Sequence, residues 1–191
     1  MAKFFGNLNL VLLVGLLLAA AVIYGIGPNA EPVQAALRWL HLFFGITWIG
    51  LLYYFNFVQI PTMPSVPAEL KPGVSKYIAP AALFYFRWAA AFTVLTGALV
   101  ALTAGGWPGY LVAALKLDPA YRLIGIGMWL ALIMAANVWF VIWPNQKKAL
   151  GIVPAEDAAK AKAASVAMMA SRTNTMLSLA MLYCMVNFNG G

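Results

Sequence analysis

The chain has 191 residues, of which 64% are apolar or aromatic and only 9% are charged. Soluble domains carry about 25% charged residues, so this composition excludes an ordinary soluble globule. The net charge of +7 comes mostly from residues beside apolar segments rather than from a groove-sized basic cluster, which argues against nucleic acid as a partner.

Five apolar segments are each long enough to cross about 30 Å of hydrocarbon. They predict an all-α fold, a polytopic transmembrane helix bundle that forms one domain over residues 1–191. Between the second and third spans, five prolines within residues 59–80 predict an ordered but irregular connection. The spans are expected at about residues 8–26, 33–58, 81–103, 121–143 and 164–188.

The distribution of lysine and arginine predicts the orientation. Arg38, Lys116 and Arg122 lie on one side of the predicted membrane, and seven lysines lie on the other. Because cytoplasmic loops carry the excess of Lys and Arg, the amino terminus is expected in the cytoplasm and the carboxyl terminus outside. The seven lysines are Lys3, Lys71, Lys76, Lys147, Lys148, Lys160 and Lys162.

Polar side chains inside the spans are candidates for function, because no water satisfies them at that depth. In the second span, His41, the only histidine, shares one side of the helix with a glycine, an indole and two amides. This side is expected to face the bundle interior. Its members are His41, Gly45, Trp48, Leu52, Asn56 and Gln59.

A similar stripe on the fifth span runs from Ser171 to Met185, and depth sorts the two stripes into two levels. The outer level is expected to bring His41 together with Met181 or Met185. Met128 shares this depth but faces opposite Asn137 on its own helix, so it is expected outside the cluster. The inner level is expected to gather Asn56, Gln59, Asn137, Asn174 and Arg87.

Histidine opposite methionine suits a haem iron, and imidazole with thioether also suits copper. The alternative is a neutral structural His41, hydrogen-bonded to a neighbouring helix. Arg87 has no acidic residue at its depth, so it predicts an anionic or quinone-like guest or, alternatively, a side chain that extends to the headgroups. The sequence therefore predicts cofactor contacts from His41, Trp48, Asn56, Asn137, Asn174 and Arg87. The candidate cofactors are haem b and, as alternatives, quinone or copper.

Three stretches resemble the amino-terminal membrane domain of the bacterial cytochrome-linked urate oxidases (urate hydroxylases). They are residues 37–61 (LRWLHLFFGITWIGLLYYFNFVQIP), 137–147 (NVWFVIWPNQK) and 170–185 (ASRTNTMLSLAMLYCM). The resemblance implies a multi-pass module of the bacterial inner membrane that passes electrons from urate to a fused c-type cytochrome domain. A looser similarity, a His-x3-Gly-x2-Trp helix, links His41 to haem-binding membrane proteins of the protoporphyrinogen-oxidase type and to copper-resistance membrane proteins.

This sequence departs from the family pattern, because it ends at Gly191 and contains no haem c attachment motif. One expectation is that a separate c-type cytochrome accepts the electrons. The other is a non-catalytic accessory subunit that stabilises a larger respiratory, photosynthetic or monooxygenase membrane complex through other membrane subunits.

Overall fold

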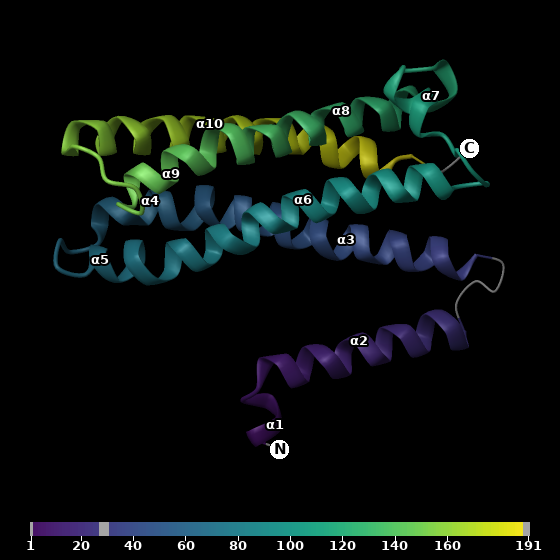
Figure 1. Cartoon of the computed structure of the whole chain (residues 1–191), viewed down its shortest axis with the longest axis horizontal. Coiled ribbons are helices and arrows are strands. Elements are labelled where there is room, and N and C mark those ends of the chain that lie inside the picture. The colour runs from purple at the N-terminus through teal and green to yellow at the C-terminus, as the bar shows by residue number, and fades with distance from the viewer. Residues whose placement is uncertain (1, 27–30, 189–191) are drawn as a thin grey trace.

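The computed structural model describes residues 2–26 and 31–188. The described residues are almost all helical and form no strand, which confirms the predicted all-α fold. Figure 1 shows long helices that run side by side, with α2 standing apart from the others. The helices are α1 (Ala2–Phe5), α2 (Leu8–Gly25), α3 (Pro32–Tyr53), α4 (Ile60–Thr62), α5 (Lys71–Gly73), α6 (Ala79–Thr103), α7 (Leu111–Leu115), α8 (Arg122–Asn137), α9 (Trp143–Ala149) and α10 (Asp157–Val186).

Among the described residues, four uninterrupted helical runs are long and apolar enough to cross a membrane. They agree with the first four predicted spans. The fifth predicted span forms as α10, one helix of 30 residues, but Arg172, Asn174 and its hydroxyl side chains keep it outside that apolar class. The number of spans and their orientation stay predictions. The four runs are Leu8–Gly25, Pro32–Ser65, Lys71–Thr103 and Pro119–Ala149.

The proline-rich connection was predicted wrongly as irregular, because helix covers most of it. Helical structure continues from α3 through Ser65 and begins again at Lys71. Pro72 lies at the start of a helical run, where a missing N–H is tolerated, whereas Pro61 and Pro80 follow π-helical segments within continuous runs. Two π-helical segments, Tyr54–Gln59 and Val74–Ile78, precede Pro61 and Pro80 and widen the turn there.

Two layers make the bundle. Helices α3 and α6 pair in one layer, while α8, α9 and α10 form the other (Figure 1). Large side chains fill the space between the layers, and Trp48, Leu52 and Met134 are fully buried. Outward-facing apolar side chains such as Phe140 (80% exposed) and Met176 (66%) suit a lipid-facing surface.

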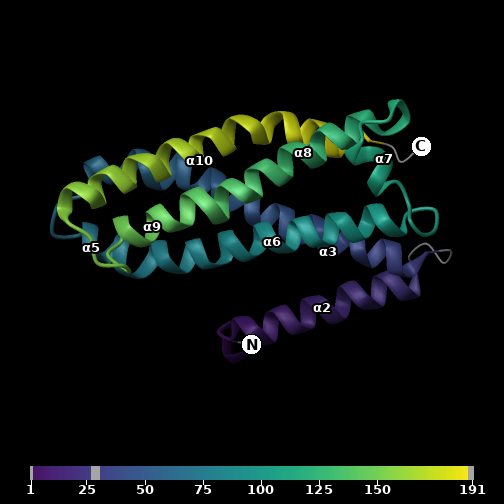
Figure 2. The ribbon, with the colours of Figure 1, turned by 45° about the horizontal axis from the view of Figure 1, so that its top comes forward.

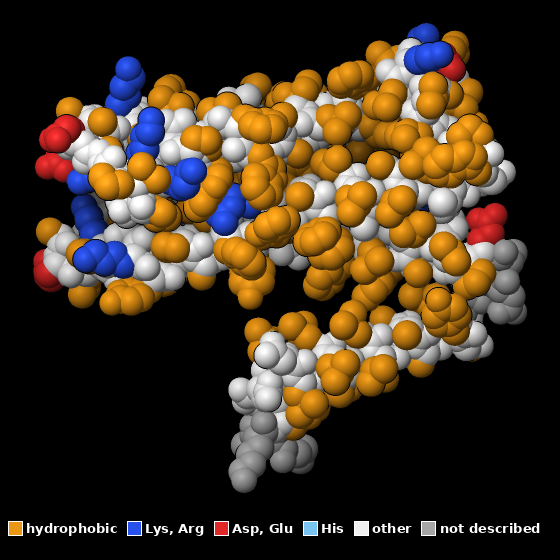
Figure 3. All heavy atoms as spheres, in the orientation of Figure 1, with side chains coloured by type: hydrophobic (Ala, Val, Ile, Leu, Met, Phe, Trp, Pro, Cys, Tyr) orange, Lys and Arg blue, Asp and Glu red, His pale blue; other side chains and the backbone are white. Residues whose placement is uncertain are grey.

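Helix α2 begins at Asn7, whose side-chain oxygen accepts a hydrogen bond from the backbone N–H of Leu10. It has no buried residue. Figure 2, turned by 45°, also shows it separate from the paired layers, and Figure 3 shows apolar side chains on both sides of the gap between α2 and the bundle. This helix therefore depends on lipid or another protein to cover its apolar surface.

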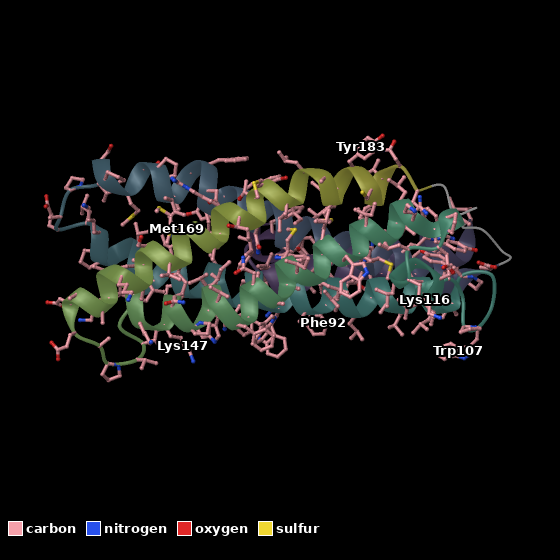
Figure 4. The ribbon with its side chains drawn as sticks, turned by 90° about the horizontal axis from the view of Figure 1, so that it is seen from above. Phe92, Trp107, Lys116, Lys147, Met169 and Tyr183 are labelled. Atoms are coloured by element: carbon pink, nitrogen blue, oxygen red, sulfur yellow. The ribbon has the colours of Figure 1, made fainter. Side chains whose placement is uncertain are left out.

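The two ends of the bundle differ in charge. Lysine and arginine gather at the end opposite α7 (Figure 3), and Lys147 lies toward it in Figure 4. Trp107 and Lys116 lie toward the other end, beside the short helix α7. We refer to this second end as the α7 end; it corresponds to the outer side of the predicted orientation.

Candidate functional site

The predicted outer level corresponds to a cavity of about 650 Å³, which we call the chamber. Residues of α3, α6, α7, α8 and α10 line it, and its walls are almost entirely apolar. Its volume lies within the range of about 300–1,000 Å³ that is usual for sites of small molecules and cofactors. Four predicted site residues line this one cavity: His41, Trp48, Met181 and Met185.

The imidazole of His41 is fixed on α6 by its Nδ1 atom, 2.9 Å from the carbonyl oxygen of Thr93. Because a carbonyl only accepts, Nδ1 carries the proton in the neutral ring and donates it. Within the described residues, Nε2 has no hydrogen-bond partner. Its lone pair is therefore available to a guest, as in histidines that bind metals while donating their other N–H to a backbone carbonyl.

Gly97 lets the imidazole lie directly against α6. A Cβ atom added at this glycine would lie 2.8 Å from Cε1 and 3.1 Å from Nδ1 of His41. The hydroxyl of Thr96 lies 3.4 Å from Nδ1, but it also lies 2.6 Å from the Phe92 carbonyl oxygen, to which it donates. The ring is therefore held by one hydrogen bond and by close contact with the helix backbone.

Trp48 lines the chamber and holds an unsatisfied polar atom beneath its wall. This side chain is fully buried, and its indole Nε1 has no hydrogen-bond partner among the described residues. An indole N–H is only a donor, and leaving a buried donor unsatisfied costs about 1–3 kcal/mol. Trp48 follows His41 by seven residues, so both lie on one side of α3. The chamber thus carries one free acceptor, Nε2 of His41, in apolar surroundings, and the unsatisfied indole N–H lies buried behind its wall.

Three methionines bring thioether sulfur to the chamber. Met185 and Met128 also line a second, neighbouring cavity, as His41 does, whereas Met181 lines only the chamber. The expectation that Met128 faces away from the cluster was wrong. Helix α7 folds beside α8, and its Leu115 also lines the chamber. Protein therefore covers α8 on a second side, whereas the sequence pattern predicted that only one side of this helix faces the interior.

The inner asparagines are bonded to protein groups. Nδ2 of Asn137 donates to Oδ1 of Asn174 at 2.7 Å and to the Ala170 carbonyl at 2.9 Å. Nδ2 of Asn174 donates to the Met134 carbonyl at 3.0 Å. These bonds join α8 to α10.

Asn56 extends the polar contacts to the helical run that follows α3. Its Nδ2 donates to the Ser171 hydroxyl at 2.7 Å and to the Leu52 carbonyl at 2.9 Å. Oδ1 of Asn56 and Oε1 of Gln59 are buried without a partner among the described residues. The amides thus bring three helical runs together, although two of their oxygens remain unsatisfied.

Arg87 does not join these asparagines, so the predicted inner cluster forms without it. Its Nη1 donates to the Leu83 carbonyl at 3.1 Å, and its guanidinium lies 3.5 Å from the centre of the Trp143 ring. A guanidinium is weakly hydrated and stacks well on an indole, which explains why this cation tolerates a site without an acid. The structure therefore offers no common cradle of Arg87, Asn56, Asn137 and Asn174 for an anionic guest.

Sequence reasoning missed the groups that hold His41. The Thr93 contact is made by a backbone carbonyl, which no sequence pattern reveals. Gly97 has no side-chain functional group, so the sequence did not mark it as a contact of His41. Arg38 was used only for orientation, although it lines the chamber.

Comparison with known proteins gives one family. Residues 112–189 match the family described as urate oxidase N-terminal. This confirms the resemblance over the second and third of the three stretches; the stretch that contains His41 lies outside the match. No curated protein and no solved structure matches significantly.

Proposed function

We propose that this chain, similar over residues 112–189 to the urate oxidase N-terminal family, is a membrane-embedded electron-transfer module that binds a b-type haem in the chamber. The observation that carries this proposal is the geometry of His41. Its Nδ1 is fixed on the Thr93 carbonyl, while Nε2 is left to an apolar cavity of about 650 Å³. A histidine that donates one ring N–H to a backbone carbonyl and leaves the other nitrogen free could hold a haem iron.

The residues around the chamber fit a haem. His41 would hold the iron through Nε2, and a thioether of Met185 or Met128, which line both cavities, would supply a second donor; Met181 lines the chamber alone. The mostly apolar lining would suit the macrocycle. The haem would supply one-electron chemistry. The amides Asn56, Asn137 and Asn174 have a different role, because their bonds to neighbouring helices set the helix positions.

Family similarity supplies the proposed electron source. By that similarity urate is the reductant, and a separate c-type cytochrome is the acceptor. The module would then lie in a bacterial inner membrane, where its apolar helices have their partner in lipid. Purified chain in lipid nanodiscs, mixed with urate and an oxidised c-type cytochrome, tests this assignment. Urate-dependent reduction that requires the chain supports it, and a rate equal to that of empty nanodiscs rejects it.

The haem assignment has a direct test. The chain is purified from cells supplied with haem precursor, and its visible spectrum, pyridine haemochrome and metal content are measured. We expect a Soret band, iron in the protein and loss of both in His41→Ala. Leucine replacements of Met128, Met181 and Met185 identify the second ligand by the change in the spectrum. Absence of a Soret band rejects the haem, and copper in place of iron supports the copper alternative.

The accessory-subunit function is favoured by one observation. Helix α2 has no buried residue, and most of its apolar side chains are exposed. A partner's membrane helix that covered α2 would make this chain a structural subunit. Mild-detergent purification tests this alternative: a stable complex that needs α2, together with a chain free of haem and copper, would support it over the electron-transfer proposal.

A further inference from the structure

A second cavity of about 560 Å³ lies at the α7 end, directly beside the chamber. We call it the vestibule. Five residues line both cavities, so the two spaces meet at the imidazole of His41. The shared residues are Arg38, His41, Gly97, Met128 and Met185.

The vestibule is more polar than the chamber, and among the described residues the charged side chains that line it are Glu31 and Arg38, of which Arg38 also lines the chamber. Arg38 precedes His41 by three residues, so it lies on the same side of α3. At 1.5 Å per residue it is about 4.5 Å nearer the α7 end. A group bound to His41 would therefore have the guanidinium of Arg38 beside the part of the group that faces the vestibule.

Arg38 has no protein partner among the described residues. The one salt bridge there joins Lys160 and Asp157, far from this cavity in sequence and at the opposite end of the bundle. The neighbouring amide of Gln34 is already bonded, because its Nε2 donates to the Val100 carbonyl and its Oε1 accepts from the Thr103 hydroxyl. Arg38 is thus the cation that a guest in the vestibule would meet.

Tyr110 also lines the vestibule, where its ring stacks on Tyr121 with ring centres 5.3 Å apart. Burial raises the pKa of the Tyr110 phenol above its ordinary value, and the positive charge of Arg38 partly opposes this rise. The phenol is therefore neutral at physiological pH and can donate a hydrogen bond. Glu31 also lines the vestibule, and its carboxylate would repel an anion bound there. The Glu31 side chain is exposed.

We propose that the vestibule binds carboxylate through Arg38, and that this carboxylate belongs to the haem held by His41. This inference rests on the proposed haem site and adds the orientation of the haem within it: propionates toward the α7 end, apolar edge toward Trp48. The apolar chamber wall offers a propionate no other cation, and a buried carboxylate without a partner is strongly unfavourable. A fork of guanidinium donors matches a carboxylate well.

Apoprotein in nanodiscs tests the orientation by reconstitution with haem and with haem dimethyl ester, whose propionates carry no charge. The wild-type chain is expected to bind haem about tenfold to a hundredfold more tightly than the ester, as a charge-assisted hydrogen bond implies. Arg38→Gln should bind haem only as well as the ester. Lys116→Gln is the matched control, because Lys116 lies at the same end (Figure 4) but lines neither cavity.

The outcomes separate this inference from the proposal on which it rests. Equal binding of haem and ester by the wild-type chain, both lost in His41→Ala, overturns the carboxylate contact and leaves the haem site standing. No binding of either compound overturns both. If succinate stabilises the ester complex in an Arg38-dependent manner while haem and ester bind equally, the vestibule binds a free anion, and the propionate assignment is wrong. A preference for haem that survives Arg38→Gln excludes Arg38 as the partner.

Discussion

Replacing Gly97 with alanine perturbs His41 without changing any ligand atom. The new Cβ would lie 2.8 Å from Cε1 of the imidazole. Carbon atoms in contact are separated by about 3.5 Å or more, so the ring must move by about 0.7 Å. This shift acts on the 2.9 Å bond between Nδ1 and the Thr93 carbonyl, which fixes the ring orientation.

The magnitude follows from three opposing effects. Loss of the hydrogen bond costs about 1 kcal/mol, and overpacking costs about 1–3 kcal/mol. Alanine in a helix returns about 0.5–1 kcal/mol relative to glycine. We therefore expect the apoprotein to lose about 1–3 kcal/mol of unfolding free energy. Because groups that orient a ligating histidine typically contribute 10–100-fold to metal affinity, haem binding should weaken by about that factor.

Haem titration and denaturation in the same detergent measure both quantities. Gly50→Ala is the matched control, since Gly50 also lines the chamber but an added Cβ there meets nothing within 4 Å. It should retain wild-type haem affinity and be slightly more stable. If Gly97→Ala binds haem with the wild-type affinity and spectrum, the clamped imidazole is not the ligand and the reasoning fails.

Three further replacements test other parts of the structure. Trp48→Phe removes the buried, unpartnered N–H, and this gain of about 1–3 kcal/mol should offset most of the packing lost with the smaller ring; haem binding should stay unchanged, and a loss of more than about 3 kcal/mol of unfolding free energy would contradict the unsatisfied donor. Asn174→Ala should lower the unfolding free energy by about 2 kcal/mol without abolishing haem binding, because its amide bonds to α8. The control Thr173→Ala should change the unfolding free energy by less than about 0.5 kcal/mol, because the Thr173 hydroxyl bonds only within α10. Equal losses in the two variants would refute the inter-helix role of the amide. In Gly127→Ala the new Cβ would lie 2.8 Å from Cβ of Cys184, so chemical unfolding should show a decrease of about 1–3 kcal/mol in the unfolding free energy. An unchanged unfolding free energy would mean that α8 and α10 can move apart at no cost.

The sequence predicted the features that depend on composition and periodicity. Apolar length located α2 and the three long helical runs, and the stripe from His41 to Gln59 faces inward as its 3.6-residue period indicates. His41, Met181 and Met185 line one cavity, as expected for residues at similar depth on neighbouring helices, and their role as ligands stays a prediction.

Other features depend on contacts between helices, which the residue pattern of one helix does not reveal. Met128 reaches the chamber because α7 covers a second side of α8, and no residue pattern indicated that return of the chain. Arg87 turns to the face of Trp143, a partner from another helical run. The π-helical segments also change the register near Asn56 and Asn137, where a fixed 100° step was assumed. These are properties of tertiary packing.

The central claim is that Nε2 of His41 ligates haem iron, and the chain allows a direct measurement because it contains a single histidine. Pulsed electron paramagnetic resonance of the ferric protein, expressed with ¹⁵N-labelled histidine, separates this nitrogen from the unlabelled haem nitrogens. We expect one strongly coupled ¹⁵N nucleus that disappears in His41→Ala. A ferric haem spectrum without ¹⁵N coupling would contradict this claim.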